Sequence, residues 1–369
     1  MSPSRSPQNL LSFARRLCAG LLASVLLACA LISAPAQAAE GNKFRVAWTI
    51  YAGWMPWDYA AFSGIVDKWA KKYGIQIEVV QINDYVESIN QYTAGAFDGC
   101  VMTNMDALTI PAVGGVDSTA LIVGDFSNGN DGVVLKGKGA KLADIKGRKV
   151  NLVELSVSHY LLARALESVG LSEKDLQTVN TSDADIVAAW ATPEVEAVVT
   201  WNPLLAEVKA TPQASEVFDS SKIPGEIIDM MVVNTATLQK NPALGKALVG
   251  AWYEVMQLMS GTDAAAKAAR SHMAQASGTD LAGYDAQLAT TRMFYTAKDA
   301  VEFTNSAALP TTMNRVAAFS FAHGLLGEGA ANADVVGMSF PGGKTVGDAG
   351  NVKLRFDPTY MALAADGKL

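Results

Sequence analysis

Phe44-Arg-Val-Ala-Trp-Thr-Ile50 runs directly into Tyr51-Ala-Gly-Trp-Met-Pro-Trp-Asp-Tyr59, and this stretch decides the predicted fold. The first segment is an alternating, largely apolar run typical of a β-strand, and residues Phe62 to Tyr73 have apolar side chains at helical spacing. The turn between them carries four aromatic residues, a glycine, a proline and one acid. In open α/β sheets, ligands lie beyond the carboxyl ends of the strands. The stretch therefore predicts an α/β fold with a ligand-binding turn.

The same strand–turn–helix order follows twice more along the chain. A strand pattern over Ile75–Ile82 leads into a helix that begins after Asp84, and a strand pattern over Phe97–Thr103 leads into a helix at Asn104. Three such units in a row predict a parallel sheet covered by helices.

The length of the chain predicts two lobes. About 330 residues follow the N-terminal segment considered next, and this exceeds one compact core. The turn-rich stretch 124–132 is the expected crossover, so that residues 42–124 and 230–330 form the first lobe and residues 125–229 the second. Residues 331–369 have no clear pattern, and we assign this C-terminal extension to neither lobe.

Residues 1–38 have the pattern of a secretory signal peptide that is removed. A basic start is followed by the apolar segment Leu17–Ile32 and by Ala36-Gln-Ala38, which resembles a cleavage site. We therefore expect export to the periplasm. Leu27-Ala-Cys29 weakly resembles a lipoprotein box, so lipidation at Cys29 stays open.

The charge of the remaining chain argues against nucleic acid as a partner. Removal of three arginines leaves 29 − 3 = 26 basic residues against 36 acidic ones, a net charge of −10. Cys100 is then the only cysteine, so no internal disulfide can form. Its apolar surroundings predict a buried structural thiol.

The sequence contains no recognisable catalytic or metal-binding motif. The three histidines, His159, His272 and His323, lie outside any H-E-x-x-H or H-x-x-E-H pattern, and no G-x-S-x-G occurs. We expect no catalytic residues, no metal and no cofactor, and hence no enzyme.

Five stretches, taken in order, resemble the periplasmic substrate-binding proteins of nitrate/taurine-type ABC importers. They are KFRVAWTIYAGWMPW (43–57), NQYTAGAFDGCVMTNMDAL (90–108), DIKGRKVNLVELSVSHYLLARAL (144–166), EAVVTWNPLLAEV (196–208) and IPGEIIDMMVVN (223–234). The resemblance covers roughly residues 42–330. It is closest to the branch associated with urea-carboxylase genes, which implies guanidine or a urea-like compound as ligand.

The resemblance implies a two-lobed α/β binding protein of type II with the ligand in a cleft between the lobes. The lobes would close about a hinge of crossover strands and deliver a small molecule to an ABC permease at the inner membrane. We expect the exported protein to be a monomer.

The turns that the resemblance places at the cleft carry acids and no Lys or Arg. An anion would meet these acids without a cationic partner. Guanidinium fits better, because it is planar, stays charged, matches a carboxylate fork and can lie against Trp faces. Urea ranks lower because it carries no charge to compensate the desolvated carboxylates. Leu155 stands where relatives tend to have Gly, which also counts against an anion.

We therefore predict a set of acidic, aromatic and amide ligand contacts. The candidates are Glu154, Asp229, Trp57, Trp54, Asp106, Trp201, Asp58, Tyr51 and Asn104.

Other interpretations stay open for several of these residues and for the protein. Asp58 and Asp106 stand near helix starts, where acids are common for dipole reasons. Asp229 could pair with an arginine or hold a hinge hydrogen bond. Urea, or an anion such as a sulfonate or nitrate, remains an alternative ligand. The alternatives to a transport protein are a periplasmic sensor subunit and an enzyme with the same fold.

Overall fold

The computed structural model describes residues 42–369, so the predicted signal segment and Cys29 lie outside the described residues. The strands are β1 (Lys43–Trp48), β2 (Gln76–Gln81), β3 (Gly99–Thr103), β4 (Ser118–Ser127), β5 (Asp131–Lys136), β6 (Lys149–Leu152), β7 (Gln177–Asn180), β8 (Ala197–Trp201), β9 (Ala214–Asp219), β10 (Ile228–Asn234), β11 (Thr291–Met293), β12 (Gly337–Phe340), β13 (Lys344–Val346) and β14 (Val352–Phe356).

Helices and short helical turns connect these strands. The α-helices are α2 (Met55–Phe62), α3 (Ile65–Lys72), α4 (Tyr85–Thr93), α5 (Asn104–Ala107), α6 (Val157–Ser168), α7 (Ile186–Trp190), α8 (Leu204–Lys209), α9 (Thr235–Lys240), α10 (Pro242–Met259), α11 (Ala264–Ala276), α12 (Leu281–Leu288), α13 (Ala297–Thr304), α14 (Ala308–Ala322) and α15 (Thr359–Ala365). The short turns are η2 (Leu108–Ala112), η3 (Leu142–Ile145), η4 (Glu173–Asp175), η5 (Asp183–Asp185), η6 (Ser220–Lys222) and η7 (Pro341–Gly343).

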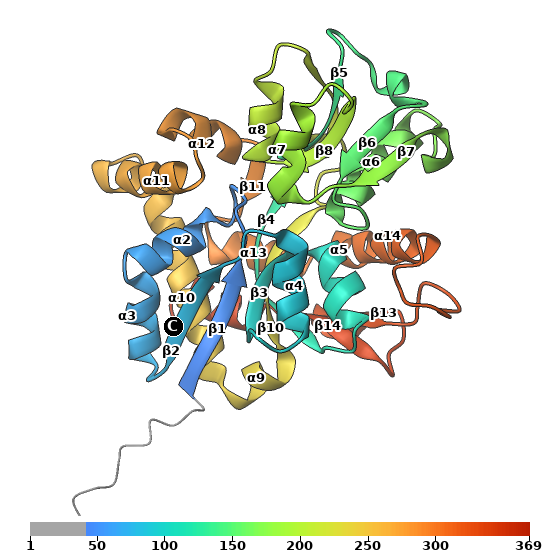
Figure 1. Ribbon diagram of the computed structural model, residues 1–369. Helices are drawn as coiled ribbons and strands as arrows, with labels where there is room; N and C mark the ends of the chain where they lie inside the picture. Colours follow the sequence, from blue (N-terminus) through green and yellow to red (C-terminus); the bar gives the residue numbers. More distant parts are fainter. Residues whose placement is uncertain (1–41) are drawn as a thin grey trace, which may run out of the picture. The chain divides into compact units, whose positions relative to one another are not determined.

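Within residues 42–369, the strands form two sheets, each covered by helices (Figure 1). The nine-stranded sheet has the order β13-β12-β14-β4-β10-β3-β1-β2, and β11 pairs with β4. The five-stranded sheet has the order β7-β6-β8-β5-β9. We call the first sheet with its helices the large lobe, and the second sheet with α6, α7 and α8 the small lobe.

The large lobe is built on the predicted strand–turn–helix units. β1 pairs in parallel with both β2 and β3, and β10 lies antiparallel between β3 and β4. Every residue of β3 is buried, as expected for a central strand covered on both faces. The predicted cap of α4 is also present, because the Asp84 side chain accepts the Glu87 N–H.

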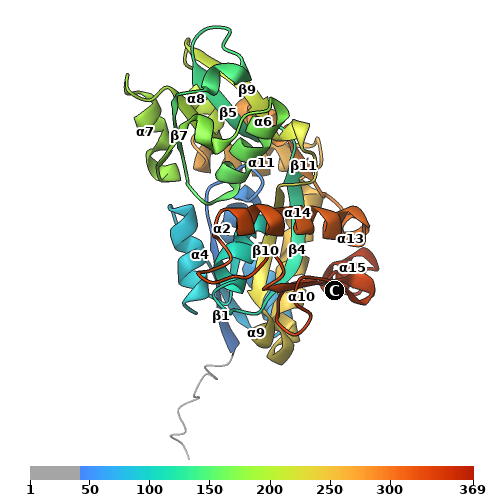
Figure 2. The same ribbon diagram turned by 90° about the vertical axis from the view of Figure 1, so that its right-hand side faces the viewer.

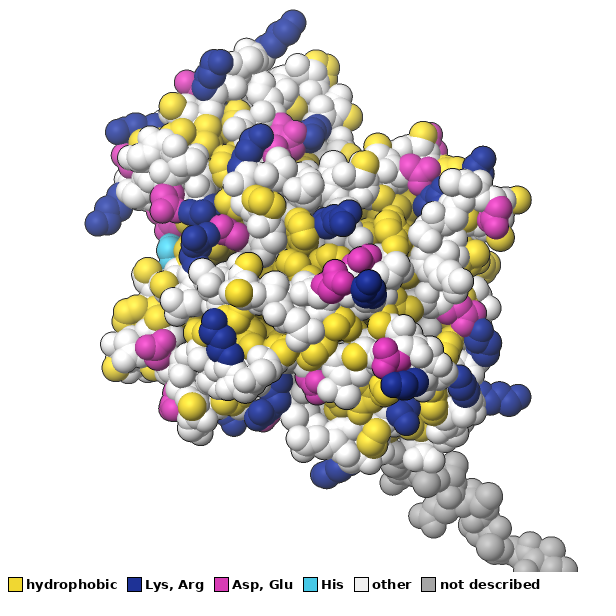
Figure 3. Space-filling model, turned by 180° about the vertical axis from the view of Figure 1, so that it is seen from behind, with side chains coloured by type: hydrophobic (Ala, Val, Ile, Leu, Met, Phe, Trp, Pro, Cys, Tyr) yellow, Lys and Arg dark blue, Asp and Glu magenta, His cyan; other side chains and the backbone are white. Residues whose placement is uncertain are grey.

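The C-terminal residues complete the large lobe. β14 pairs in parallel with β4, with Leu354 opposite Ser118, and β12 pairs with β14. Residues 331–369, which the sequence left unassigned, therefore extend the first sheet. Seen from behind, apolar side chains gather near the middle of the molecular face, with acidic and basic side chains beside them (Figure 3).

Two crossings connect the lobes and lie side by side (Figure 2). Residues 128–130 join β4 to β5, within the stretch where the sequence predicts a crossover, and residues 220–227 join β9 to β10. The Ser127 N–H donates to the Ile227 carbonyl at 3.0 Å, and the Gly129 N–H donates to Ser220 Oγ at 2.7 Å. These paired crossings are the natural place for a hinge.

No helix in the described part of the chain combines the length and apolar character needed to span a membrane.

Candidate functional site

The register of the strands places acidic side chains from both lobes near one another. On β10, Asp229 lies opposite Thr103 of β3 on one side and opposite Asp125 of β4 on the other. At the beginning of β5, Asp131 lies opposite Trp201, the last residue of β8. The crossing between β4 and β5 is short, so Asp131 stays close enough to Asp125 to influence its ionisation.

A small cavity lies between the lobes at this point. It is lined by Tyr51, Trp54, Tyr85, Thr103, Asp131, Val157, Trp201, Ile227 and Asp229. Its volume of about 10 Å³ is of the order that one water molecule requires. Within residues 42–369, no lysine or arginine lines this cavity. Both lobes contribute to the lining, so the space is enclosed only when the lobes are together.

Four aromatic rings form a continuous wall around the cavity. The ring centroids of Tyr51 and Trp54 are 5.0 Å apart, those of Trp54 and Tyr85 5.7 Å, and those of Tyr85 and Trp201 5.6 Å. Consecutive rings are tilted or edge-to-face, an arrangement that aromatic pairs prefer. The wall is therefore aromatic on both lobes.

The acids at the cavity are incompletely hydrogen-bonded. Asp125 Oδ1 accepts the Tyr51 hydroxyl at 3.1 Å, and Asp131 Oδ2 accepts the Ser127 hydroxyl. Among the described residues, no donor reaches Asp125 Oδ2 or Asp229 Oδ2. Asp125 and Asp229 face each other across neighbouring strands, and they can bond only if one of them carries a proton.

Asp106 forms a second acidic group at the wall. Its Oδ2 accepts the Tyr85 hydroxyl at 2.7 Å and the Thr103 hydroxyl at 2.8 Å. The backbone N–H of Val157, on the small lobe, also stabilises the ionised carboxyl. Asp106 Oδ1 makes no further hydrogen bond to a described side chain.

Burial raises the pKa values of all these acids. It raises the pKa of Asp125 and of Asp131 to about 7, and that of Asp106 to about 6. Burial, together with the charge of Asp125, raises the pKa of Asp229 well above its usual value. In the ligand-free protein these acids therefore hold protons to higher pH than usual, and no lysine or arginine of the described chain lines the cavity to keep them ionised.

The sequence of the chain matches a family model described as "NMT1/THI5 like" over residues 67–266, more than half of the chain. The chain belongs to the NMT1/THI5-like family. A putative binding protein of Brucella abortus (strain 2308) is 30% identical over 103 residues, 28% of this chain and 31% of that protein. The taurine-binding periplasmic protein of Escherichia coli (strain K12) is 25% identical over 132 residues, 35% of this chain and 40% of that protein. The matches thus span about a third of the length of these curated relatives.

Solved structures show which fold this NMT1/THI5-like protein has. The alkanesulfonate-binding protein SsuA from Xanthomonas axonopodis pv. citri, bound to MOPS, aligns with a TM-score of 0.64 at 17% identity, covering 78% of this chain and 95% of that one. The periplasmic nitrate-binding protein NrtA from Synechocystis PCC 6803 aligns with a TM-score of 0.59 at 14% identity, covering 89% and 99%. The fold is the two-lobed α/β fold of type II periplasmic binding proteins, as the sequence predicts.

Several predicted ligand contacts of this NMT1/THI5-like protein lie at the cavity. Tyr51, Trp54, Trp201 and Asp229 line it directly. Asp106 lies at its wall through bonds to lining residues. These side chains come from both lobes, and the register described above brings them together.

The other four predicted contacts lie elsewhere. Trp57 packs on Trp252, at a centroid distance of 5.3 Å, in the core behind the cavity. Asn104 joins α5 to the return crossing, since its side chain donates to the Glu226 carbonyl and accepts the Ile228 N–H.

Asp58 and Glu154 are the two predicted acids outside the cavity. Asp58 Oδ2 lies 2.9 Å from His272 Nε2 of α11, where α11 packs against α2. Glu154 lines a separate open hollow with Asp84, Glu87 and Asp183. Its neighbour Leu155 has a φ of 63°, and this left-handed turn carries the chain from β6 into α6.

Sequence analysis missed Asp125, Asp131 and Tyr85. Asp125 and Asp131 fall in the Gly- and Asn-rich stretch 124–132, which has the composition of a turn. In the structure, β4 extends to Ser127, so Asp125 is a buried strand residue. The signal that could have revealed it is an acid that follows the apolar run 120–123 after a single glycine.

Cys100 is fully buried in β3, as the sequence predicts for a structural thiol. Burial raises the pKa of its thiol to about 12, which disfavours the reactive thiolate.

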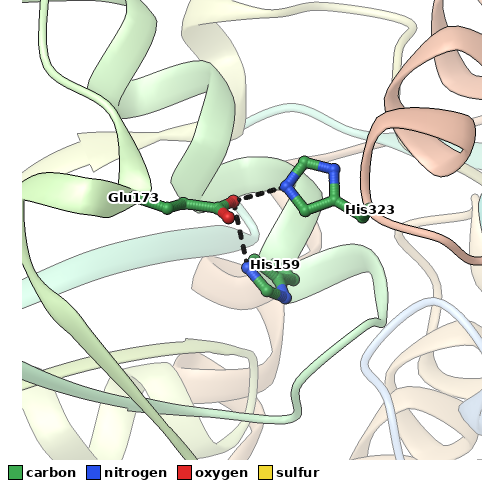
Figure 4. Close-up of side chains that lie close together, drawn as sticks. All are labelled: His159, Glu173 and His323. Carbon is green, nitrogen blue, oxygen red and sulfur yellow. Dashed lines mark hydrogen bonds and ion pairs between the residues drawn. The ribbon is translucent and has the colours of Figure 1, made fainter.

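A second cluster of titratable groups joins the lobes away from the cavity (Figure 4). Glu173 Oε1 lies 3.0 Å from His159 Nε2 and 2.8 Å from His323 Nε2. The three ligand atoms would be close enough to hold a metal ion.

The hydrogen bonds within this cluster favour protons over a metal. His159 Nδ1 accepts the Leu155 N–H at 3.0 Å, so the ring proton of neutral His159 is on Nε2, where a metal would need a lone pair. His323 Nδ1 lies 2.8 Å from the Phe319 carbonyl and its Nε2 faces Glu173, so both nitrogens act as donors in the charged form. Accordingly, the bond to Glu173 raises the pKa of His323.

Proposed function

We propose that this protein is the periplasmic substrate-binding component of an ABC importer, and that it captures a small, flat cation, with guanidinium as the best candidate. The family and the fold support the binding role, and the relatives named above are themselves called binding proteins. The observation that carries the choice of ligand is the convergence of Asp229, Asp125, Asp131 and Asp106 on an aromatic cavity that no Lys or Arg among residues 42–369 lines.

The unpartnered atoms at the site are mostly acceptors. Asp125 Oδ2, Asp229 Oδ2 and Asp106 Oδ1 are three carboxylate oxygens without a donor from the described side chains. A guanidinium ion has only donors, directed outward in one plane. Charge-assisted hydrogen bonds to two carboxylates would neutralise the ligand, while the rings of Trp54 and Trp201 cover its faces.

A hollow lined by acidic residues also supports a cation as the ligand. The open hollow next to the cavity is lined by Asp84, Glu87, Glu154 and Asp183, with no basic residue of the described chain among its lining. Negative charge in a cleft raises the local concentration of cations. Glu154 would act there by attraction rather than by contact.

The second candidate is a small anion. The relatives are named for taurine, alkanesulfonate and nitrate, and give no support to guanidine. Trp54 Nε1 and Ser158 Oγ, two buried donors without partners among the described residues, also favour it. An anion would nevertheless require protonation or displacement of several buried carboxylates, at a cost of several kcal/mol for each one left ionised. Urea would fit only a largely protonated site.

In the proposed role, the protein acts as a monomer in the periplasm and passes its ligand to a permease at the inner membrane. A sensor subunit would have the same lobes. These roles are separated by measuring uptake of labelled guanidinium in cells with and without the gene. Deletion of a transport subunit abolishes uptake, whereas deletion of a sensor leaves basal uptake intact.

A thermal-shift panel on the purified protein tests the ligand. Guanidinium, methylguanidinium, urea, nitrate and taurine are compared at equal ionic strength. A ligand at about 100 times its dissociation constant adds about 2.7 kcal/mol to stability. We expect guanidinium to raise the Tm most. A rise in Tm with nitrate or taurine, and no rise with guanidinium, would overturn the proposal of a cationic ligand.

A further inference from the structure

Two aspartates reach from one lobe to a helix of the other. Asp106, on α5 of the large lobe, lies at the N-terminus of α6 in the small lobe. Asp183, at the start of η5 in the small lobe, lies at the N-terminus of α4 in the large lobe. Both side chains are buried, with exposures of 0% and 6%. The arrangement is reciprocal, since each lobe supplies one acid and one helix start.

At α6, the internal acid takes one backbone donor that an anion would need, and Ser156 takes two others. The Val157 N–H stabilises the Asp106 carboxylate. The Ser158 N–H donates to the Ser156 hydroxyl at 3.2 Å, and the His159 N–H donates to the Ser156 carbonyl at 3.0 Å. The backbone N–H groups in the first turn of this twelve-residue helix are therefore bonded within the protein, whereas the Ser158 hydroxyl has no partner among the described residues.

At α4, the pattern is the same. The Tyr85 N–H donates to Asp183 Oδ1 at 3.3 Å, and the Glu87 N–H donates to Asp84 Oδ1 at 2.9 Å. The Ser182 hydroxyl donates to Asp84 Oδ2 at 3.2 Å. Because Ser182 precedes Asp183 in the chain, this bond fixes Asp183 of the small lobe relative to Asp84 of the large lobe.

These contacts bear directly on ligand choice. Free N–H groups and the dipole make a helix N-terminus a site for anions. Here a carboxylate of the opposite lobe occupies each such position when the lobes are closed. The partners of Asp106, namely Tyr85, Thr103 and Val157, line the cavity, so its charge acts on any bound ligand.

We infer that Asp106 and Asp183 are specificity-determining residues that act as built-in anions: they occupy the N-termini of α6 and α4, two of the helix starts at the cleft, and exclude anionic ligands from the closed site. This inference deepens the proposed function and rests on it. It accounts for a cation site on a fold whose helix starts would otherwise favour anions.

Isothermal titration calorimetry on the full chain tests the inference. Wild type, Asp106→Asn and Asp183→Asn are titrated with guanidinium, sodium nitrate and methanesulfonate at pH 8. The control is Asp263→Asn, which removes an acid from the N-terminus of α11, outside the cavity lining, where Asn is an equally good cap. Thermal unfolding confirms that each variant is folded.

We expect wild type and Asp263→Asn to bind guanidinium and neither anion. Asp106→Asn should gain measurable binding of nitrate or methanesulfonate, and should bind guanidinium roughly tenfold less tightly than wild type does. Asp183→Asn should gain anion affinity with a smaller loss for guanidinium, because Asp183 does not line the cavity.

The outcomes separate this inference from the proposed function. If folded variants bind guanidinium as wild type does and gain no anion affinity, Asp106 and Asp183 have no role in selection, and the proposed ligand stands. If wild type binds no guanidinium but the variants gain anion affinity, the exclusion stands and the proposed ligand is wrong. Should Asp106→Asn not fold, Asp183→Asn alone decides.

Discussion

Asp125 and Asp229 are the residues on which the account of the site depends most. They lie opposite each other on β4 and β10, fully buried, and each has a carboxylate oxygen without a donor. Two neighbouring buried carboxyl groups cannot both be ionised unless a positive charge compensates them. A bound cation supplies that positive charge, whereas the ligand-free protein must keep a proton on the pair.

Replacing one member of the pair should weaken binding while preserving the fold. We expect Asp229→Asn to lower guanidinium affinity by roughly tenfold to a hundredfold, because a charge-assisted bond is lost. The Tm of the ligand-free variant should stay level or rise, since a buried uncompensated acid is removed. Calorimetry and thermal unfolding measure both. A large fall in Tm would show that the pair stabilises the fold instead.

The raised pKa values of the acids predict that binding strengthens as pH rises. Asp125 and Asp131 titrate near pH 7 in the free protein, so they are largely protonated at pH 5 and ionised at pH 8. A cation binds the ionised form, and guanidinium affinity should increase across this window with release of protons. Titrations in buffers of different ionisation enthalpy count those protons. An affinity that falls with pH would indicate an anion or a neutral ligand.

The same shifts predict the stability of the ligand-free protein. A carboxyl whose folded pKa exceeds its unfolded value binds more protons in the native state, so stability falls as pH rises from about 4 to about 7. Denaturant unfolding at pH 5 and pH 8 measures the free energy of unfolding at each pH. We expect saturating guanidinium to reduce the difference between these two free energies.

Glu154 illustrates how a residue predicted from sequence can lie beside the site rather than in it. The sequence predicts it as a ligand contact, yet it lines the separate open hollow. Glu154→Gln should therefore change guanidinium affinity by only about twofold at low salt, and less at high salt, where attraction over distance is screened. A tenfold loss that persists at high salt would place Glu154 in contact with the ligand.

At the scale of elements, α14 contributes a second connection between the lobes. Arg315, Phe319 and His323 recur at intervals of four residues, and hence share one face of α14. Phe319 packs edge-to-face on Tyr160 of α6, and His323 bonds Glu173 of η4. These contacts connect α14 of the large lobe to α6 and η4 of the small lobe (Figure 2).

The stability that His323 contributes should depend on pH. Its pKa is raised by Glu173, while the two histidines and their hydrogen bonds lower the pKa of Glu173 to about 2 against the effect of burial. A raised histidine pKa gives stability that is present at low pH and lost as pH rises through the folded value. His323→Gln should lower the Tm by roughly 1–3 °C at pH 6 and by less at pH 9. Equal effects at both pH values would contradict a charged His323.

The elements show what sequence alone could and could not predict. The units from β1 to α5 were predictable because each strand is a local apolar run followed by a local helix signal. β12, β13 and β14 were not, since they are short and join the sheet only because β14 pairs with β4, far away in the chain, and β12 and β13 follow outward from β14. Asp125 was missed for the same reason: only its partner strand β10 identifies 118–127 as one long strand.

At the scale of the whole molecule, the arrangement described here is a closed one. The cavity is small and its walls come from both lobes, so a ligand can enter only when the lobes separate at residues 128–130 and 220–227. Small-angle scattering should show a smaller radius of gyration with saturating guanidinium than without it. An unchanged radius would mean that the free protein is already closed, and that ligand does not drive the motion.

The central claim is that buried carboxylates select a small cation, and a paired titration tests it most directly. Guanidinium is titrated calorimetrically into wild type and Asp229→Asn at pH 8, and taurine is titrated into wild type under the same conditions. We expect saturable binding of guanidinium to wild type, a loss of affinity of at least tenfold in the variant, and no binding of taurine. Saturable binding of taurine to wild type, with no heat from guanidinium, would contradict it.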